Sequence, residues 1–263
     1  MSEELFRDRW ALITGASSGL GEEFAKQLAR KGCHLVLTAR SREKLVALAA
    51  RLHAAHGVQC RVMDADLASE AGMASLLDHL ELFEIDHVIA NAGFGHWGLF
   101  DETSLESQTE MVRVNCESLV ALVHRTLAKM IARRFGGVIL VASTASFQPI
   151  PKFAVYAASK AFVRSFGEAL AEETRDRGVR VSVLCPGPMP TGFQARAGTH
   201  ITGGQRALVW SAQQTVELAL REYAAERVVV VPGVMNRLSA VVGSHTPRRV
   251  MLPFLRRMMR SRG

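Results

Sequence analysis

The sequence predicts an α/β fold in which a doubly wound parallel sheet of about seven strands carries helices on both faces. Short runs rich in Val, Ile and Leu alternate with longer segments whose apolar residues recur at helical spacing. The apolar runs are nearly continuous, which is typical of parallel strands buried on both faces. The chain has 263 residues, enough for a large buried core.

The elements follow one another without a linker, repeat or low-complexity segment. Each apolar run is predicted to be a strand and each amphipathic segment a helix. The predicted strands are Trp10–Thr14, His34–Thr38, Cys60–Asp64, His87–Asn91, Val138–Ser143, Val179–Cys185 and Arg227–Val231. The predicted helices lie near 19–31, 42–56, 69–82, 105–134, 153–177 and 212–224.

Charge and composition narrow the function classes. The formal charge is +7, and the seven arginines between Arg237 and Gly263 have no acid among them, so the rest of the chain is neutral. This distribution does not indicate a nucleic-acid-binding face. No apolar stretch reaches the roughly 18 residues of a membrane span, and the polar N-terminus lacks the apolar segment of a signal peptide. Four scattered cysteines favour a reduced, cytoplasmic compartment.

A glycine-rich turn, TGASSGLG, follows the first predicted strand. Its first glycine permits a tight turn, and the later two let backbone approach a pyrophosphate and let the next helix pack closely. The first amides of that helix attract anions. We therefore predict a dinucleotide-binding Rossmann fold, although a plain structural turn is the alternative. The predicted contacts are Gly15, Ser17, Ser18, Gly19, Leu20 and Gly21.

The end of the second strand indicates which dinucleotide binds. In such folds an acid about 20 residues past the glycines binds the ribose 2′-hydroxyl, whereas an arginine accommodates a 2′-phosphate. Here the residue is Arg40, followed by Ser41 and Arg42, with no acid available to repel a phosphate. The pattern favours NADP(H) over NAD(H). The alternative is that Arg40 only solvates a strand end.

The stretch VYAASK places Tyr156 and Lys160 four residues apart, on one face of a predicted helix. Alone, this spacing usually means a packed ring beside a solvated charge. Ser143 stands thirteen positions before Tyr156 at the end of a predicted strand, and Asn115 lies in the long predicted helix. With the glycine-rich turn, Ser143 and Asn115 all present, a catalytic role is the favoured interpretation of the pair. The alternatives are an ordinary strand-end serine for Ser143 and a helix-bending or capped residue for Asn115.

The ordered motifs resemble the short-chain dehydrogenase/reductase family from about Trp10 to Val231. The glycine turn, the NAG and YAASK stretches, Asn115, VASTAS around Ser143 and the PG dipeptide at Pro186 occur in the family's order. Each motif alone is modestly specific, but the ordered set is strong evidence. The resemblance implies hydride transfer between NADPH and a carbonyl or secondary alcohol.

The resemblance also implies a catalytic set of Asn115, Ser143, Tyr156 and Lys160. Tyr156 would be the general acid in carbonyl reduction and the base in reverse. Lys160 and the charge of the oxidised nicotinamide would lower the pKa of Tyr156 from its ordinary value of about 10. Lys160 would also hold the nicotinamide ribose. Ser143 would hydrogen-bond the substrate oxygen, and Asn115 would hold a water that links Lys160 to solvent.

Further cofactor contacts follow from the same resemblance. Asp66 matches the family acid that binds the adenine amino group, with Asp64 as a competing candidate. Residues after the later strands would contact the riboses, the nicotinamide and the pyrophosphate. The remaining implied contacts are Leu67, Asn91, Ala92, Gly93, Pro186, Gly187 and Thr191, in addition to Tyr156 and Lys160.

Apolar residues near these motifs predict a hydrophobic substrate. They come from FGHWGLF after the NAG motif, from the stretch after Ser143 and from a predicted lid near 188–211. Ordinary core packing is the alternative for each. The candidate substrate contacts are Phe94, His96, Trp97, Phe147 and Phe193. The nine histidines form no HExxH or other ligand spacing, so no metal is predicted.

The last residues, RRVMLPFLRRMMRSRG, predict a basic amphipathic helix. Such a helix lies on an anionic membrane surface, or it covers the substrate entrance or a sister subunit. We predict a single catalytic domain over 1–236 and an extension over 237–263 that packs on or beside it. The resemblance implies a homodimer or homotetramer formed through the long helices near 105–134 and 153–177.

Two other functions are compatible with these motifs. One is a non-catalytic NADPH sensor that acts through a protein partner; the intact Ser143, Tyr156 and Lys160 argue against it. The other is an NAD-linked alcohol dehydrogenase, against which Arg40 argues.

Overall fold

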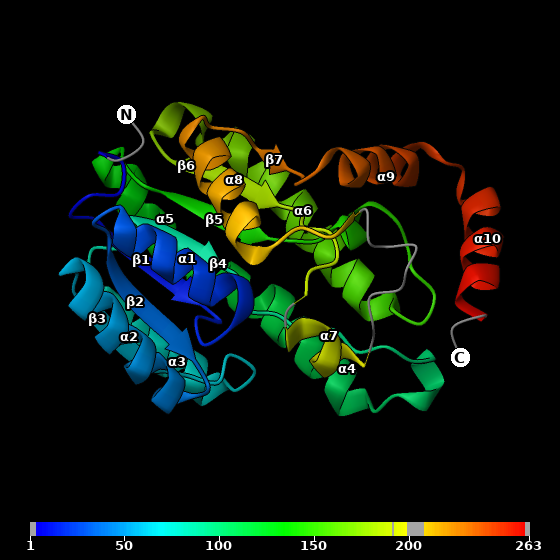
Figure 1. Ribbon diagram of the computed structural model, residues 1–263, viewed down its shortest axis with the longest axis horizontal. Coiled ribbons are helices and arrows are strands. Elements are labelled where there is room, and N and C mark those ends of the chain that lie inside the picture. Colours follow the sequence, from blue (N-terminus) through cyan, green and yellow to red (C-terminus); the bar gives the residue numbers. More distant parts are fainter. Residues whose placement is uncertain (1–3, 191, 199–207, 261–263) are drawn as a thin grey trace.

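A seven-stranded parallel sheet forms the centre of the computed structural model, which describes residues 4–190, 192–198 and 208–260 (Figure 1). The strand order is β3-β2-β1-β4-β5-β6-β7, which confirms the predicted fold class. The chain changes direction across the sheet between β1 and β4, and doubly wound folds bind ligands at such a switch point. The strands are β1 Trp10–Thr14, β2 His34–Ala39, β3 Cys60–Asp64, β4 His87–Ala90, β5 Gly137–Val141, β6 Arg180–Leu184 and β7 Val229–Val230.

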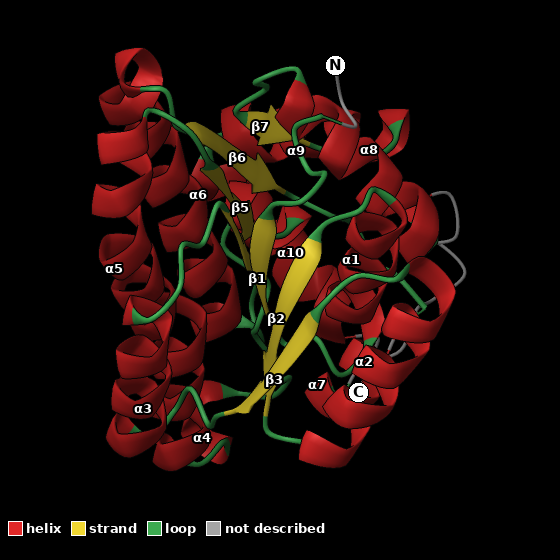
Figure 2. Ribbon diagram, turned by 90° about the vertical axis from the view of Figure 1, so that its left-hand side faces the viewer, coloured by secondary structure: helices red, strands yellow, loops and turns green. Residues whose placement is uncertain are grey.

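Helices cover both faces of the sheet (Figure 2). The longer ones are α1 Gly19–Arg30, α2 Arg42–His56, α3 Glu70–Glu81, α4 Leu105–Val112, α5 Ser118–Arg133, α6 Ala154–Thr174, α8 Ala212–Ala224, α9 Val234–His245 and α10 Arg248–Arg260. Strand residues alternate between two cores: on β1, Ala11 and Ile13 pack with α1, α2 and α8, whereas Leu12 packs with α3, α5 and α6. This two-sided burial explains the continuous apolar runs of the sequence.

The predicted helix over 105–134 is interrupted. Between α4 and α5, residues Arg113–Glu117 form a π turn, which widens the helix by one residue. Asn115 lies in this turn and is buried. Turns of this kind are frequent at functional sites.

The strands β4, β5, β6 and β7 all end earlier than predicted, and the ends of β4 and β5 carry predicted site residues. β4 stops at Ala90 because the Asn91 amide turns to the Thr14 hydroxyl, 3.0 Å away, instead of continuing the ladder. β5 stops at Val141, and Ser143 caps the 3-10 turn Thr144–Phe147 by accepting a hydrogen bond from the Ala145 amide at 3.1 Å. Both residues therefore leave the sheet at its carboxyl edge.

The C-terminal part forms two helices where the sequence predicted one. α9 and α10 extend at the right-hand end of the view in Figure 1, beyond β7. None of the helices in the described part of the chain is long and apolar enough to cross a membrane.

Candidate active site

The glycine-rich turn joins the end of β1 to the start of α1. Gly15 and Gly19 adopt φ values of +66° and +59°, which side chains disfavour. A Cβ on Gly21 would lie 2.2 Å from the Gly15 carbonyl oxygen, so only glycine permits this packing. Ser18 precedes α1 without capping it through its side chain, which leaves the first amides of the helix to an anion. The turn therefore fits the predicted pyrophosphate.

The other predicted residues of the turn divide by exposure. Ser18 is exposed and Ser17 half-buried, so both side chains are accessible from the turn. Leu20 is buried in the core with α1 and α2, so its side chain serves packing.

Thr14, which the sequence reasoning missed, ties this turn to the residues after β4. Its hydroxyl accepts hydrogen bonds from the amides of Asn91 and Ala92 at 3.0 and 2.8 Å. The Asn91 side chain returns a hydrogen bond to the Thr14 carbonyl at 2.9 Å. The available signal was its position, since Thr14 is the first residue of the glycine motif.

Arg40 lies just after β2 and is exposed, as a ligand of a 2′-phosphate requires. Its Nη1 is 3.4 Å from Glu110 Oε1 on α4. The sequence predicted that no acid is available near Arg40. This prediction is corrected, because Glu110 is distant along the chain but lies close to Arg40 in space.

Asp66 follows β3, and one of its carboxylate oxygens accepts a hydrogen bond from the Ala68 amide at 3.0 Å. The competing candidate, Asp64, is paired with Arg42 at 2.5 Å, and this hydrogen bond lowers the pKa of Asp64. Asp66 is exposed, while its neighbour Leu67 is buried in the core beside α3. Of the two acids, Asp66 is the one without an arginine partner among the described contacts.

Tyr156 and Lys160 lie on α6, and both are almost fully buried. Burial raises the pKa of Tyr156 to about 12, and a hydrogen bond with Ser143 opposes this rise. Burial lowers the pKa of Lys160 to about 8, and its Nζ donates a hydrogen bond to the Val141 carbonyl at 2.8 Å.

These pKa values show no lowering of the phenol's pKa by Lys160, whereas the lowering expected from the charge of the oxidised nicotinamide stays a prediction. The ammonium lies 5.9 Å from the centre of the Tyr156 ring and is directed to the backbone of β5. Desolvation therefore exceeds the attraction between the two groups. At neutral pH the phenol holds its proton, which is the form that a general acid needs.

Asn115 joins the π turn to two other parts of the site. Its Oδ1 accepts a hydrogen bond from the Phe94 amide at 3.1 Å, and its Nδ2 donates to the Phe94 carbonyl at 3.0 Å and to Ser159 Oγ at 2.9 Å. A Cβ on Gly93 would lie 2.8 Å from Asn115 Oδ1 and 3.2 Å from Lys160 Nζ. The glycine of the NAG motif thus lets Asn115 and Lys160 approach. Ser159 was missed, although it lies within YAASK.

An aromatic enclosure surrounds the Tyr156 ring. The ring of Phe153, at the start of α6, lies 4.4 Å from it, and that of Phe193, on the short helix α7 Gly192–Ala197, lies 5.4 Å from it. Trp97 meets Phe153 edge-on at 5.5 Å. Phe153 was missed because it lies outside the motifs from which the substrate contacts were chosen. Trp97 and Phe193, both predicted as substrate contacts, belong to this enclosure.

The three other predicted substrate contacts lie differently. Phe94 packs in the small apolar cluster that contains Tyr156. His96 turns toward α4, where its Nδ1 is 3.2 Å from Ser107 Oγ. The Phe147 ring packs against the α3–α5–α6 core, with the Arg164 guanidinium 4.4 Å above it, so the structure does not bring it to Tyr156.

Pro186 and Gly187 follow β6 beside Ser143. The Pro186 carbonyl accepts a hydrogen bond from the Thr144 amide at 2.9 Å. A Cβ on Gly187 would lie 2.4 Å from Asn236 Oδ1 on α9, so this segment also requires glycine. Thr191 lies outside the described residues. The neighbouring Cys185 is buried, which raises the pKa of its thiol to about 12 and favours a packing role.

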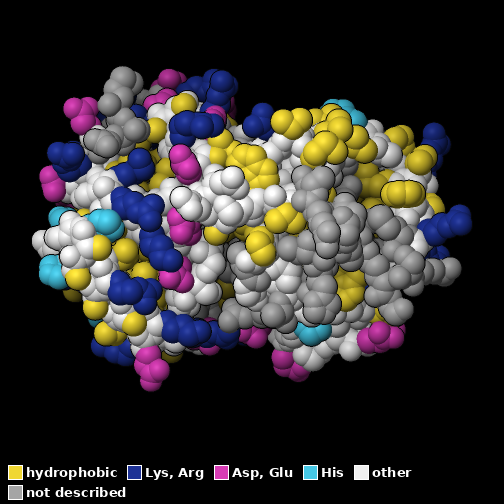
Figure 3. Space-filling view, in the orientation of Figure 1, with side chains coloured by type: hydrophobic (Ala, Val, Ile, Leu, Met, Phe, Trp, Pro, Cys, Tyr) yellow, Lys and Arg dark blue, Asp and Glu magenta, His cyan; other side chains and the backbone are white. Residues whose placement is uncertain are grey.

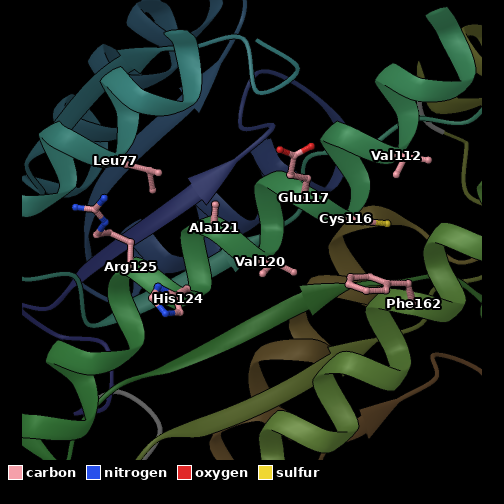
Figure 4. A pocket seen from close by; sticks show the side chains of 9 residues that line it. All are labelled: Leu77, Val112, Cys116, Glu117, Val120, Ala121, His124, Arg125 and Phe162. Atoms are coloured by element: carbon pink, nitrogen blue, oxygen red, sulfur yellow. The ribbon is translucent and has the colours of Figure 1, made fainter. Parts of the chain in front are cut away.

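A hollow of about 540 Å³ lies beside α5, and Tyr156 is not among the residues that line it (Figure 4). Val120, Ala121 and His124 of α5 line it, with Phe162 of α6 and Leu77 of α3 at its borders. The described side chains include no group of three or more His, Cys, Asp or Glu that could hold a metal ion.

Comparison with known sequences agrees with this geometry. A family model described as short chain dehydrogenase matches residues 9–201. Mouse 17-beta-hydroxysteroid dehydrogenase type 3 is 31% identical over 93% of this chain and 81% of its own. Very-long-chain 3-oxoacyl-CoA reductase of Pyrenophora tritici-repentis is 35% identical over 68% of this chain, which spans about half (54%) of that relative.

Solved structures show the same fold. A short-chain dehydrogenase from Sphingobium yanoikuyae in complex with NADPH aligns with a TM-score of 0.82 and 30% identity, covering 90% of this chain and 93% of that one. The bulky-bulky ketone specific alcohol dehydrogenase from Comamonas testosteroni aligns with a TM-score of 0.77 and 27% identity, covering 96% and 94%.

Proposed function

The chain belongs to the short-chain dehydrogenase family, and we propose that it is an NADPH-dependent reductase of bulky, hydrophobic ketones. The family makes it an oxidoreductase that acts on CH–OH and C=O groups. One observation carries the finer proposal. The buried side chain of Tyr156 is enclosed by the rings of Phe153 and Phe193.

The preference for NADPH rests on Arg40. It is exposed at the end of β2, where a guanidinium accommodates a 2′-phosphate. Asp66, the glycine turn and the residues after β4 provide the adenine, pyrophosphate and ribose contacts of the proposed site. NADPH, when bound, supplies the hydride.

The protein's own groups position the ketone and supply the proton. Ser143, at the carboxyl edge of β5, donates a hydrogen bond to the carbonyl oxygen and stabilises the developing alkoxide. Tyr156 passes its phenolic proton to that oxygen. Lys160 keeps a positive charge near the phenolate that results. Asn115 accepts a hydrogen bond from the Phe94 amide and so holds the neighbouring Gly93 close to Lys160.

The substrate class follows from the enclosure. Aromatic rings on two sides of Tyr156 exclude water and favour an apolar group beside the carbonyl. The names of three similar proteins refer to a hydroxysteroid, a very-long-chain acyl thioester and a bulky ketone. We therefore propose a large apolar ketone in preference to a small polar one.

The test follows NADPH oxidation with ketones graded in size and polarity, and repeats it with NADH. We expect turnover that rises with apolar size and that falls by about 10²- to 10⁴-fold in Tyr156→Phe. The chain has only one other tyrosine, the buried Tyr223, so Tyr223→Phe is a matched control that should keep the activity. Tight NADPH binding without turnover on any ketone would instead favour the sensor function.

A further inference from the structure

We propose that α9 and α10 form a docking surface for an anionic lipid membrane. Together they expose a concentration of large apolar side chains. Eight of the sixteen exposed large apolar side chains in the described part of the chain fall between 234 and 254. They are Val234, Met235, Leu238, Val241, Val242, Val250, Leu252 and Phe254. Monomeric soluble proteins seldom expose so many apolar residues together without a binding partner.

The apolar residues of α10 face in two directions. Met251 and Leu255 are buried, so one side of α10 is anchored on the protein. Phe254 is 65% exposed, so apolar surface remains on another side. Arg248 joins the two helices by donating a hydrogen bond to the Gly243 carbonyl near the end of α9, at 2.9 Å. The exposed apolar residues of both helices therefore sit on connected, anchored elements.

The charge around this surface indicates which partner binds to it. Arg249, Arg256 and Arg257 on α10 are exposed, and the chain from Arg237 to Gly263 contains no acid. Figure 3 shows hydrophobic side chains gathered at the upper right, where α9 lies, and Lys and Arg side chains at the right-hand edge, where α10 lies. Apolar side chains lie here beside arginines for which the described residues show no ion pair, and this combination matches the headgroup and acyl boundary of an anionic bilayer.

A second copy of the chain fits this surface less well. A two-fold contact through the same surface would bring two acid-free arginine clusters toward each other, and their repulsion would oppose association. A nucleic acid would pair with the arginines but would leave the apolar residues of α9 in water.

The surface is adjacent to the candidate active site. α9 packs against the 3-10 turn Thr144–Phe147, which follows Ser143. A Cβ on Gly243 would lie 3.0 Å from Gln148 Oε1, at the end of that turn. Docking through α9 and α10 thus holds the catalytic side of the fold near the lipid. Entry of a membrane-dissolved ketone from the docked side rests on the proposed function, whereas the docking itself does not.

The test measures co-sedimentation of the full chain with vesicles, without cofactor or substrate, so that its result is independent of the enzymatic activity. Vesicles of phosphatidylcholine mixed with phosphatidylglycerol are compared with pure phosphatidylcholine at low and high salt. We expect binding to the anionic vesicles, weaker binding at high salt and little binding to the neutral ones.

Two double variants separate the contributions of charge and of apolar contact to vesicle binding. Arg249→Glu with Arg257→Glu should weaken binding at least roughly tenfold, since each basic residue near the surface contributes about a factor of five. Leu238→Ser with Val241→Ser removes two side chains that are 54% and 56% exposed and should also weaken it. The control for charge is Lys44→Glu with Arg177→Glu, and the control for apolar contact is Val46→Ser with Leu82→Ser. All four residues are exposed outside α9 and α10.

Three results would overturn the proposal: no sedimentation with anionic vesicles, equal loss in the control variants, or binding that is indifferent to salt. A smaller particle in size-exclusion chromatography for Leu238→Ser with Val241→Ser would assign the surface to a second copy of the chain instead. Far-UV circular dichroism of each variant checks that it folds.

Discussion

Arg40 Nη1 lies 3.4 Å from Glu110 Oε1, so an ion pair connects the end of β2 to α4. In the proposed site the guanidinium of Arg40 must bind the 2′-phosphate of NADPH. The Glu110 carboxylate competes with that phosphate for the same cation. A residue 70 positions away in the sequence thereby enters the choice of cofactor.

Glu110→Gln should tighten NADPH binding by up to about fivefold, because an exposed ion pair contributes at most about 1 kcal/mol. Fluorescence titration measures the Kd values of NADPH and NADH. Arg40→Asp should weaken NADPH binding and leave NADH binding much less affected. Glu106→Gln, an exposed acid on the same helix, is the control. An equal change for both cofactors in Glu110→Gln would contradict the competition.

Asn115→Ala should lower both stability and turnover. It removes two hydrogen bonds to Phe94 and one to Ser159 from a buried position, which costs about 2–3 kcal/mol of unfolding free energy. Ser159→Ala should cost less, about 1 kcal/mol. Urea unfolding of both variants and of the double variant measures this. Because the two residues share a bond, the double variant should lose less than the sum; strict additivity would refute the connection.

The catalytic candidates could be predicted because the motifs that carry them occur in the order of a known family. Tyr156 and Lys160 share a helix face at four-residue spacing, and Ser143 stands where an apolar run ends. The π turn that holds Asn115 could not be predicted. Its conformation depends on hydrogen bonds to Phe94 and Ser159, which are 21 and 44 positions away in the sequence.

Ring orientation was also beyond the sequence. Phe147 and Phe153 lie on either side of the same loop, yet Phe147 packs under Arg164 and Phe153 against Tyr156. Which side a ring takes depends on the tertiary packing and not on the motif. The same holds for α9, where Val234, Leu238 and Val241 recur at helical spacing, but this spacing does not show that their side chains are exposed.

Gly95→Val should reduce turnover by disturbing the enclosure. A Cβ at Gly95 would lie 2.8 Å from the Phe153 ring and 3.1 Å from that of Phe193, so one of the rings must move. We expect a higher KM for bulky ketones with a smaller change in kcat. Adding Phe193→Ala makes room for the new side chain and should restore part of the loss. If Gly95→Val left KM unchanged, the rings would not form the substrate wall.

Phe162→Arg should reduce the size of the assembly if the family's dimer or tetramer forms through α5 and α6. Phe162 is 44% exposed, stacks on Phe166 with ring centres 6.1 Å apart and borders the hollow of Figure 4. An arginine there places a charge in an apolar contact. Sedimentation velocity measures the outcome, with the exposed Leu82→Arg as control. An unchanged particle would place any subunit contact elsewhere.

His87 should make stability fall in mild acid. It is buried between Tyr223 and the Leu5 carbonyl, and burial lowers its pKa from 6.5 to about 4. Between these two pH values the unfolded chain binds a proton at this histidine and the folded chain does not. The free energy of unfolding is therefore highest above about pH 6.5 and falls as the pH decreases toward 4. The full decline is about 3 kcal/mol. Urea unfolding across this range should show a shallower pH dependence for His87→Asn, which does not titrate. The exposed His245→Gln should keep the slope of the natural chain, and an equal slope in His87→Asn would show that other groups cause it.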